Sequence, residues 1–225
     1  MREAEKRTPA RRKVESLSRR TVATRTKASD IRRRDLMDAG ERTFVQQGFA
    51  ATTIEDITHK AGVAKGTFYL YFDSKEALLA ALRDRFIEGS RGRIEALATR
   101  VPATDWAGRL DAWVEGGIRY YLDHVKLHDV LFHTGQQGHG SKAQNAAVLE
   151  LAELIRAGSA ARAWRVESSE LVSVFLFYAL HGMVDHIVGN RRSDHEAAIR
   201  LSQRIVRNAI GLPPQAGSRR VLSRS

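Results

Sequence analysis

The chain has 225 residues, of which 43% are hydrophobic and 28% are charged, so it can form one or two compact domains with a real core. It contains no cysteine, which excludes a disulfide scaffold, a thiolate zinc site and a cysteine nucleophile. Its net charge of +11 predicts an anionic partner such as nucleic acid.

The positive charge is concentrated at the two ends of the chain. Residues 1–34 contain thirteen Lys or Arg and four acids, residues 216–225 contain three Arg and no acid, and residues 35–215 carry a net charge of −1. Residues 1–28 also have few large apolar side chains, so burial cannot offset the entropy lost on ordering them. We therefore expect a disordered basic arm over 1–28, which adds non-specific DNA affinity, and a flexible basic tail over 213–225.

From Ser29 onward the apolar spacing predicts helices almost to the end of the chain, with no alternating strand pattern. The first helix runs to about Gly48, because glycine accepts the positive φ that often ends a helix. Thr53 followed by Asp56 is typical of a capping box at the start of a second helix. A short third helix is expected over 64–71.

Longer helices are predicted in the rest of the chain. Ser74 begins a fourth helix, which Pro102 stops. Further helices are expected at 105–124, 126–134, 141–162, 169–189 and 194–211, with a glycine-rich loop over 135–140. The predicted fold class is thus all-α, with about nine helices.

The helix expected over 169–189 is apolar nearly all round, so it is buried on more than one side. Its apolar run contains His181, Asp185 and His186, and no uninterrupted run approaches the ~18 residues of a membrane span. We therefore expect no membrane partner.

Residues 52–75 predict two short helices joined by a tight turn at Gly62-Val63. This is the helix-turn-helix layout, in which the second helix enters the major groove of DNA. The exposed side of that helix has a lysine for phosphate or guanine, a glycine that permits close approach, and three hydroxyl groups. These residues are Lys65, Gly66, Thr67, Tyr69 and Tyr71.

The same segment reads LMDAGERTF at 36–44 and GFAATTIEDITHKAGVAKGTFYLYFDSKEALL at 48–79. It resembles the N-terminal domain of the TetR/AcrR family of bacterial transcriptional regulators, over about a fifth of the chain. The sequence departs from the family pattern at Leu70 and at Ala64, where many members have Ser, so one phosphate contact is missing. The resemblance implies DNA contacts by Thr53, Lys65, Gly66, Thr67, Tyr69, Tyr71 and Lys75.

The resemblance also implies a helix-turn-helix domain over 29–75 and a helical regulatory and dimerisation domain over 76–212. A two-fold dimer reads two half-sites of a pseudo-palindromic operator, roughly 34 Å apart. The helices over 169–189 and 194–211 carry more apolar surface than one neighbour covers, which favours a four-helix bundle with a second copy. The candidate interface residues are Phe175, Ala179, Gly182, His186, Ile199, Gln203 and Val206.

Several aromatic residues and histidines of the second domain are candidates for an apolar effector cavity, because ligand pockets are mostly apolar with a few placed polar groups. The effector is expected to be small and apolar or aromatic. A solid core is the other interpretation for each of these residues. The candidates are Trp113, Tyr121, His124, Phe132, Phe175, Tyr178 and His181.

Four histidines lie within sixteen residues, at 124, 128, 133 and 139. His124 and His128 have an i, i+4 spacing that suits a metal, but no HExxH signature accompanies them. We interpret them as solvated or capping histidines and expect neither a metal nor another cofactor. The sequence also lacks the GxSxG, P-loop and Rossmann patterns, so we do not expect an enzyme.

Together these features predict a dimeric, cytoplasmic, sequence-specific DNA-binding regulator, most simply a repressor released by a small ligand. The alternative is a constitutive DNA-binding protein with a filled C-terminal core and no effector. A cavity in the second domain would favour the first interpretation.

Overall fold

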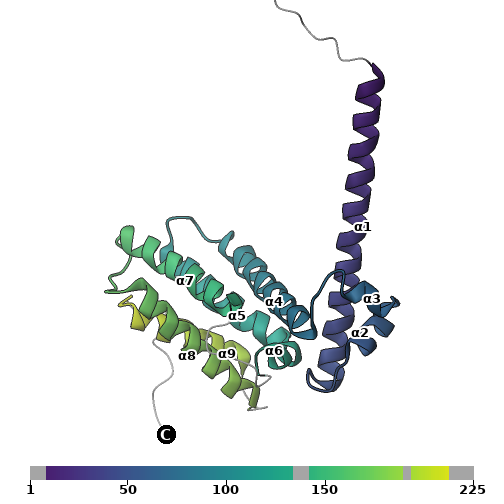
Figure 1. The fold of residues 1–225 in the computed structure, drawn as a ribbon. Helices are drawn as coiled ribbons and strands as arrows, with labels where there is room; N and C mark the ends of the chain where they lie inside the picture. Colours follow the sequence, from purple (N-terminus) through teal and green to yellow (C-terminus); the bar gives the residue numbers. More distant parts are fainter. Residues whose placement is uncertain (1–8, 134–141, 190–193, 213–225) are drawn as a thin grey trace, which may run out of the picture. The chain divides into compact units, whose positions relative to one another are not determined.

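A computed structural model describes residues 9–133, 142–189 and 194–212, and in this part the chain forms nine α-helices and no strand (Figure 1). The predicted all-α fold is therefore confirmed. The expected 135–140 loop, the 213–225 tail and the first eight residues of the arm lie outside the described residues. The helices are α1 (Pro9–Gln47), α2 (Ile54–Ala61), α3 (Lys65–Phe68), α4 (Lys75–Ala98), α5 (Trp106–Asp123), α6 (Val125–Phe132), α7 (Lys142–Ala160), α8 (Ser169–Gly189) and α9 (His195–Ala209).

The start of α1 differs from the sequence-based expectation. The helix begins at Pro9 rather than near Ser29, so most of the segment expected to be a disordered arm is helical. Proline suits a first helical position, and no further proline or glycine occurs before Gly40. Arg, Lys and Ala, which are frequent in this stretch, are strong helix formers. The shortage of apolar residues limits tertiary burial, but it does not prevent backbone hydrogen bonding along the helix.

The chain divides into two compact units, Met1–Ala81 and Leu82–Ser225, and the boundary falls inside α4. In the first unit, Leu36, Phe44, Ile57 and Phe68 are fully buried between α1, α2 and α3. Gly40 lets α1 approach the start of α4, because a Cβ added there would lie 2.6 Å from Leu78 Cδ2. The small core thus fixes the two short helices against α1.

The core of the second unit lies between α5, α7, α8 and α9, and its most buried members include Leu110, Leu151, Ile155 and Leu176. Trp164 joins this core through a hydrogen bond from its Nε1 to the carbonyl oxygen of Ile155, at 2.9 Å. This hydrogen bond satisfies the only polar atom of the indole, as burial of a tryptophan in a core requires.

An ion pair ties α9 to α5 within the second unit. Arg207 Nε donates to Asp111 Oδ1 at 2.9 Å, and the guanidinium also bonds the second carboxylate oxygen. The two side chains are only 11% and 15% exposed. The hydrogen bonds to Asp111 raise the pKa of Arg207 above its ordinary value, although burial opposes the shift.

Candidate functional site

The start of α2 is fixed by the predicted capping box. Asp56 N donates to Thr53 Oγ1 at 3.1 Å, and Asp56 Oδ2 accepts from both the backbone N and the hydroxyl of Thr53 at 2.8 Å. The backbone N–H and then the hydroxyl of Thr53 lower the pKa of Asp56, which therefore stays ionised at neutral pH. Both donors of Thr53 are used inside the unit, so the structure gives this residue a capping role.

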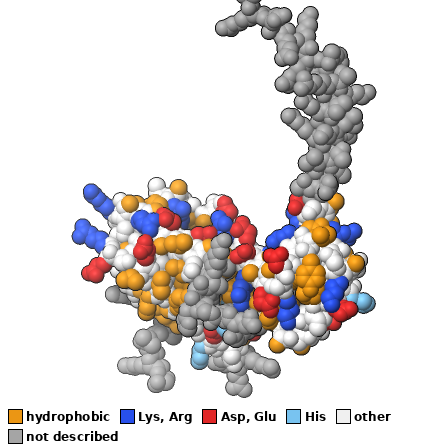
Figure 2. All heavy atoms as spheres, in the orientation of Figure 1, with side chains coloured by type: hydrophobic (Ala, Val, Ile, Leu, Met, Phe, Trp, Pro, Cys, Tyr) orange, Lys and Arg blue, Asp and Glu red, His pale blue; other side chains and the backbone are white. Residues whose placement is uncertain are grey.

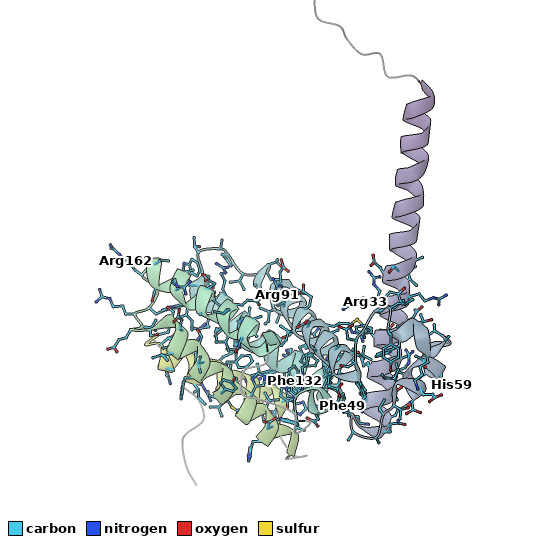
Figure 3. All side chains as sticks on the ribbon, in the orientation of Figure 1. Arg33, Phe49, His59, Arg91, Phe132 and Arg162 are labelled. Carbon is cyan, nitrogen blue, oxygen red and sulfur yellow. The ribbon has the colours of Figure 1, made fainter. Side chains whose placement is uncertain are left out.

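A tight turn connects α2 to α3. Gly62 has φ +66°, in the left-handed region that glycine tolerates, and its N–H donates to the carbonyl oxygens of Thr58 and His59. His59 itself points into solvent (Figure 3). The turn therefore ends α2 sharply and lets the chain re-enter a helix at Lys65.

The second helix of the motif is shorter than the predicted range 64–71. Regular α3 covers Lys65–Phe68, and the chain continues through i→i+3 hydrogen bonds at Leu70 and Tyr71. Phe68 and Phe72 are both buried, at 0% and 4% exposure, which keeps this turn against the core. Ala64 precedes α3 and provides no side-chain hydrogen bond to its first turn.

The outer side of α3 presents a compact group of the predicted DNA-contact residues. Tyr69 is 52% exposed, Lys65 is exposed, and a Cβ added at Gly66 would meet open space. Lys65 Nζ lies 3.6 Å from the exposed carboxylate of Glu55, a surface pair that a phosphate can displace at little cost. This surface can receive a DNA backbone without rearrangement of the core.

Two further predicted contacts, Thr67 and Tyr71, are half-buried. Tyr71 borders a shallow surface groove together with Leu70, Ile31 and Arg32. Leu70 is 78% exposed and Ile31 is 48% exposed, so the groove has an exposed apolar edge next to the Arg32 guanidinium. Leu70 was expected only as a departure from the family pattern, and its neighbours on α1 were not predicted.

Lys75 differs from the other predicted contacts. Its ammonium donates to the carbonyl oxygens of Phe49 at 2.7 Å and Thr52 at 2.6 Å, reaches Ala50 O at 3.5 Å, and lies 4.4 Å from the centre of the Phe49 ring. An ammonium group has three donors, so this arrangement uses its full capacity inside the unit. Lys75 therefore closes the loop between α1 and α2, and we assign it to stability rather than to DNA contact.

Replacing Lys75 with methionine is expected to destabilise the first unit by about 2 kcal/mol, because hydrogen bonds to charged groups contribute about 1.5–3 kcal/mol. Chemical denaturation followed by circular dichroism measures this change. Lys60→Met, at an exposed lysine of α2, is the matched control and should change stability by less than about 0.5 kcal/mol. Equal effects of the two substitutions would show that Lys75 has no special structural role.

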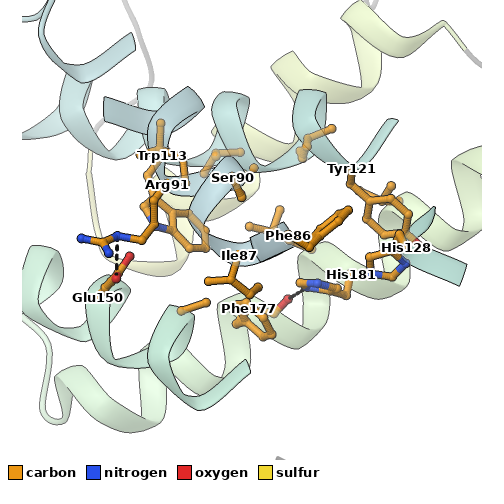
Figure 4. Close-up of a pocket in the computed structure, with 17 residues that line it drawn as sticks. Phe86, Ile87, Ser90, Arg91, Trp113, Tyr121, His128, Glu150, Phe177 and His181 are labelled. Atoms are coloured by element: carbon orange, nitrogen blue, oxygen red, sulfur yellow. Dashed lines mark hydrogen bonds and ion pairs between the residues drawn. The ribbon is translucent and has the colours of Figure 1, made fainter. Parts of the chain in front are cut away.

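The second unit contains a cavity of about 70 Å³ between α4, α5, α6, α7 and α8 (Figure 4). Three of the predicted pocket residues, Trp113, Tyr121 and His181, line it. The candidates did not include the α4 residues of its wall, because Phe86, Ile87, Ser90 and Arg91 lie in a helix with no distinctive aromatic pattern. The cavity is mostly apolar, with polar groups at its ends.

The remaining pocket assignments need correction. Phe175 and Tyr178 are 66% and 43% exposed on α8, so they point away from the core. Phe132 is buried against Phe86, with ring centres 5.5 Å apart, and does not reach the cavity. His124 also lies outside the lining, and its Nδ1 bonds the carbonyl oxygen of Tyr120 at 2.8 Å. Helical position alone did not distinguish the inner and outer faces of α8, because both are apolar.

One end of the cavity carries an ion pair between Arg91 Nε and Glu150, at 2.9 Å, and burial raises the pKa of Glu150. The other end is formed by Tyr121, His128 and His181. Tyr121 donates to Asp185 Oδ1 at 2.5 Å, and burial followed by this carboxylate raises its pKa. Burial also lowers the pKa of His128 to about 2, so its imidazole is neutral at physiological pH.

Hydrophobic side chains gather on the outer face of the second unit where α8 runs (Figure 2). Leu171, Val174, Phe175 and Tyr178 are all more than 40% exposed, and Ala179, Gly182 and His186 continue the same exposed face. Among the described helices, only α8 is long and apolar enough to cross a membrane by length and composition, with 33% of that window buried.

The expected interface residues of α9 are not on its outer face. Ile199 and Val206 are 2% exposed and belong to the core, and Gln203 Nε2 donates to the carbonyl oxygen of Asp111 at 3.2 Å. The outward apolar residues of α9 are instead Leu201 and Ile205, at 43% and 46% exposure. Ile199 and Val206, which were expected to contact a second copy, instead pack α9 against its own chain.

Comparison with known proteins gives concordant results. Residues 36–82 match the model of the family "Bacterial regulatory proteins, tetR family". The regulator EthR of Mycobacterium tuberculosis is 28% identical over 149 residues, which cover 66% of this chain and 56% of that protein. The chain thus spans about half the length of this relative.

Solved structures have the same fold. A TetR-like transcriptional regulator from Rhodococcus sp. RHA1 is 25% identical with a TM-score of 0.56, covering 80% of this chain and 96% of that one. FadR from Bacillus subtilis, solved in complex with stearoyl-CoA, is 18% identical with a TM-score of 0.63, covering 79% and 97%. Residues 36–82 thus carry the helix-turn-helix segment of the tetR family of bacterial regulatory proteins, and the chain shares the helical fold of a TetR-like transcriptional regulator over 80% of its length.

Proposed function

We propose that this protein is a sequence-specific DNA-binding transcriptional regulator that acts in the cytoplasm as a homodimer. The observation that carries this proposal is the exposed group Lys65, Gly66 and Tyr69 on α3, held directly after the capped helix α2. A cation, an open backbone and a rigid phenol suit the phosphates and base edges of a major groove. The proposed contact surface also includes Thr67 and Tyr71, which lie half-buried at its edge.

A dimer explains the exposed apolar face of α8. A single helix-turn-helix makes few base contacts, whereas a two-fold dimer reads two half-sites of a pseudo-palindromic operator. Phe175, Ala179, Gly182 and His186 of each copy would then face each other, with Leu201 and Ile205 of α9 at the side. Such contact removes from water the face that makes α8 resemble a membrane span.

We also propose that a small apolar or aromatic effector binds the cavity of the second unit and releases the repressor from DNA. The FadR structure with stearoyl-CoA supports the view that this fold can hold a small molecule. The present volume of about 70 Å³ is below the roughly 300–1,000 Å³ of typical ligand pockets, so an effector must widen the cavity. It acts on DNA binding only if it binds the widened and unwidened states with different affinities.

Lys65→Ala and Tyr69→Ala are each expected to weaken operator binding by about 1–3 kcal/mol, or roughly 5- to 150-fold, without unfolding the protein. Fluorescence anisotropy with an operator recovered by genomic-fragment selection measures the loss. The control is Arg162→Ala, an arginine that projects from the second unit into solvent (Figure 3). Unchanged operator affinity in both α3 variants, with intact circular dichroism, would refute the contact surface.

The same anisotropy assay separates a ligand-responsive repressor from a constitutive DNA-binding protein. A panel of apolar and aromatic compounds is titrated into the complex with the operator. A repressor of the proposed kind is released by at least one compound, and Trp113→Ala, which alters the cavity wall, shifts the concentration required. Release by no compound, with no compound raising the melting temperature, favours the constitutive alternative.

A further inference from the structure

Within the part of the chain that the structure describes, one buried histidine nitrogen of the second unit has no hydrogen-bond partner. His128 Nδ1 is fully enclosed, and the His128 side chain is only 4% exposed. Tyr121 stacks on its ring with centres 3.6 Å apart, and Phe86 and Phe132 pack around it at 5.7 and 4.9 Å. Burying a polar atom without a partner costs free energy, and the packed rings hold this imidazole in place. We therefore looked for a nearby group or ion that could bind the nitrogen.

Two half-exposed side chains at the end of α6, Asp129 and His133, carry polar atoms close to this nitrogen. Asp129 Oδ1 lies 3.8 Å from His128 Nδ1, too far for a hydrogen bond, and 3.4 Å from His133 Nδ1. All three ligand atoms lie within 4.8 Å of one another. Donors bound to one zinc ion at about 2.0–2.1 Å are roughly 3.4 Å apart in a tetrahedral site. Small side-chain rotations of the exposed Asp129 and His133 therefore bring the three donors onto one ion.

Outer partners that hold such a site in place are present. His133 Nε2 faces Asp185 Oδ2 at 4.0 Å, and the other oxygen of Asp185 accepts the hydrogen bond from Tyr121. A carboxylate behind a histidine ligand fixes the ring and raises its basicity, and such outer partners recur in metal sites. Tyr121 thus supports the cluster twice, by stacking on His128 and by orienting Asp185.

We propose that His128, Asp129 and His133 form a binding site for a late first-row divalent metal ion such as Zn²⁺. Two imidazoles and one carboxylate are a ligand set that such ions prefer, and three protein ligands leave one position for water or another donor. The site differs from the His124–His128 pair suggested by spacing, because His124 Nδ1 bonds the backbone carbonyl of Tyr120 in α5. Since His128 and Tyr121 also line the cavity, the ion sits beside its wall.

Isothermal titration of the untagged full-length protein with Zn²⁺, in the absence of DNA, tests this site directly. One ion per chain is expected, and Co²⁺ should give the intensified visible absorption of a tetrahedral complex. Asp129→Asn and His133→Ala, both at exposed positions, should each weaken Zn²⁺ binding at least about tenfold, as should Asp185→Asn. Because no DNA is present, the result does not depend on the proposed regulatory function.

His195→Ala removes an exposed histidine of α9 and is the matched control, with no expected effect on Zn²⁺ affinity. His128→Leu should abolish binding, and a thermal melt of that variant verifies that it is folded. The proposal is overturned if the isotherm does not saturate at one ion per chain. It is equally overturned if Asp129→Asn and His133→Ala bind Zn²⁺ as tightly as the His195→Ala control.

Discussion

Replacing Phe175 with glutamate is expected to convert the protein to a monomer and to abolish operator binding at nanomolar concentrations. Phe175 lies in the middle of the exposed apolar face of α8 and is 66% exposed in the single chain. Dimerisation would bury a carboxylate from each copy at the same place, and an uncompensated buried charge costs about 3–5 kcal/mol. That corresponds to a loss of dimer affinity by a factor of about 150 or more. Sedimentation velocity and operator anisotropy measure the two effects.

Leu149→Glu is the matched control for this experiment. Leu149 is a large apolar residue of the same unit, 60% exposed, but it lies on α7. The control should remain dimeric and bind the operator normally. A dimer that survives Phe175→Glu would place the interface elsewhere and leave the apolar face of α8 unexplained.

The second large effect is expected from Asp111→Ala, which should destabilise the second unit by about 3–5 kcal/mol. The substitution leaves the Arg207 guanidinium, 11% exposed, without the carboxylate that binds it through both oxygens. Urea denaturation followed by tryptophan fluorescence reports this loss, because Trp113 lies on α5 close to Asp111 in sequence and Trp164 lies in the same core.

A double variant separates the unpaired charge from simple loss of packing. Replacing Arg207 with methionine in the Asp111→Ala background removes the stranded charge and keeps much of the side-chain volume. The double variant should therefore be more stable than Asp111→Ala alone. If both have the same stability, the ion pair does not hold α9 on α5, and the apolar contacts of Ile199 and Val206 are sufficient.

Local signals in the sequence predicted the DNA-binding unit well. Thr53 and Asp56 specify the capping box through neighbouring groups, and Gly62 specifies the turn through its own backbone, so no distant contact is needed. Phe68 and Phe72 are four positions apart, a helical spacing, and both are buried. The role of Lys75 did not follow, because its carbonyl partners lie more than twenty residues earlier in the chain.

The second unit was harder to predict because several of its helices are apolar on two sides. On α8, Phe175 and Phe177 are two positions apart, yet one is exposed and the other is 4% exposed at the cavity. Only the position of α7 and α5 decides which face is inside. On α9, the pairing of Arg207 with Asp111 turns Ile199 and Val206 inward, and that pairing spans 96 residues.

Because α1 is continuous, the residues ahead of the helix-turn-helix segment, from Pro9 to about Ser29, form a helical extension rather than a flexible arm. A helix of 39 residues is about 58 Å long, because each residue advances the axis by about 1.5 Å. A flexible tether has no fixed direction, whereas a continuous helix gives the backbone ahead of Ser29 one axis. Adding a single residue near Ser29 would therefore rotate the helical backbone ahead of it by about 100° around the helix axis.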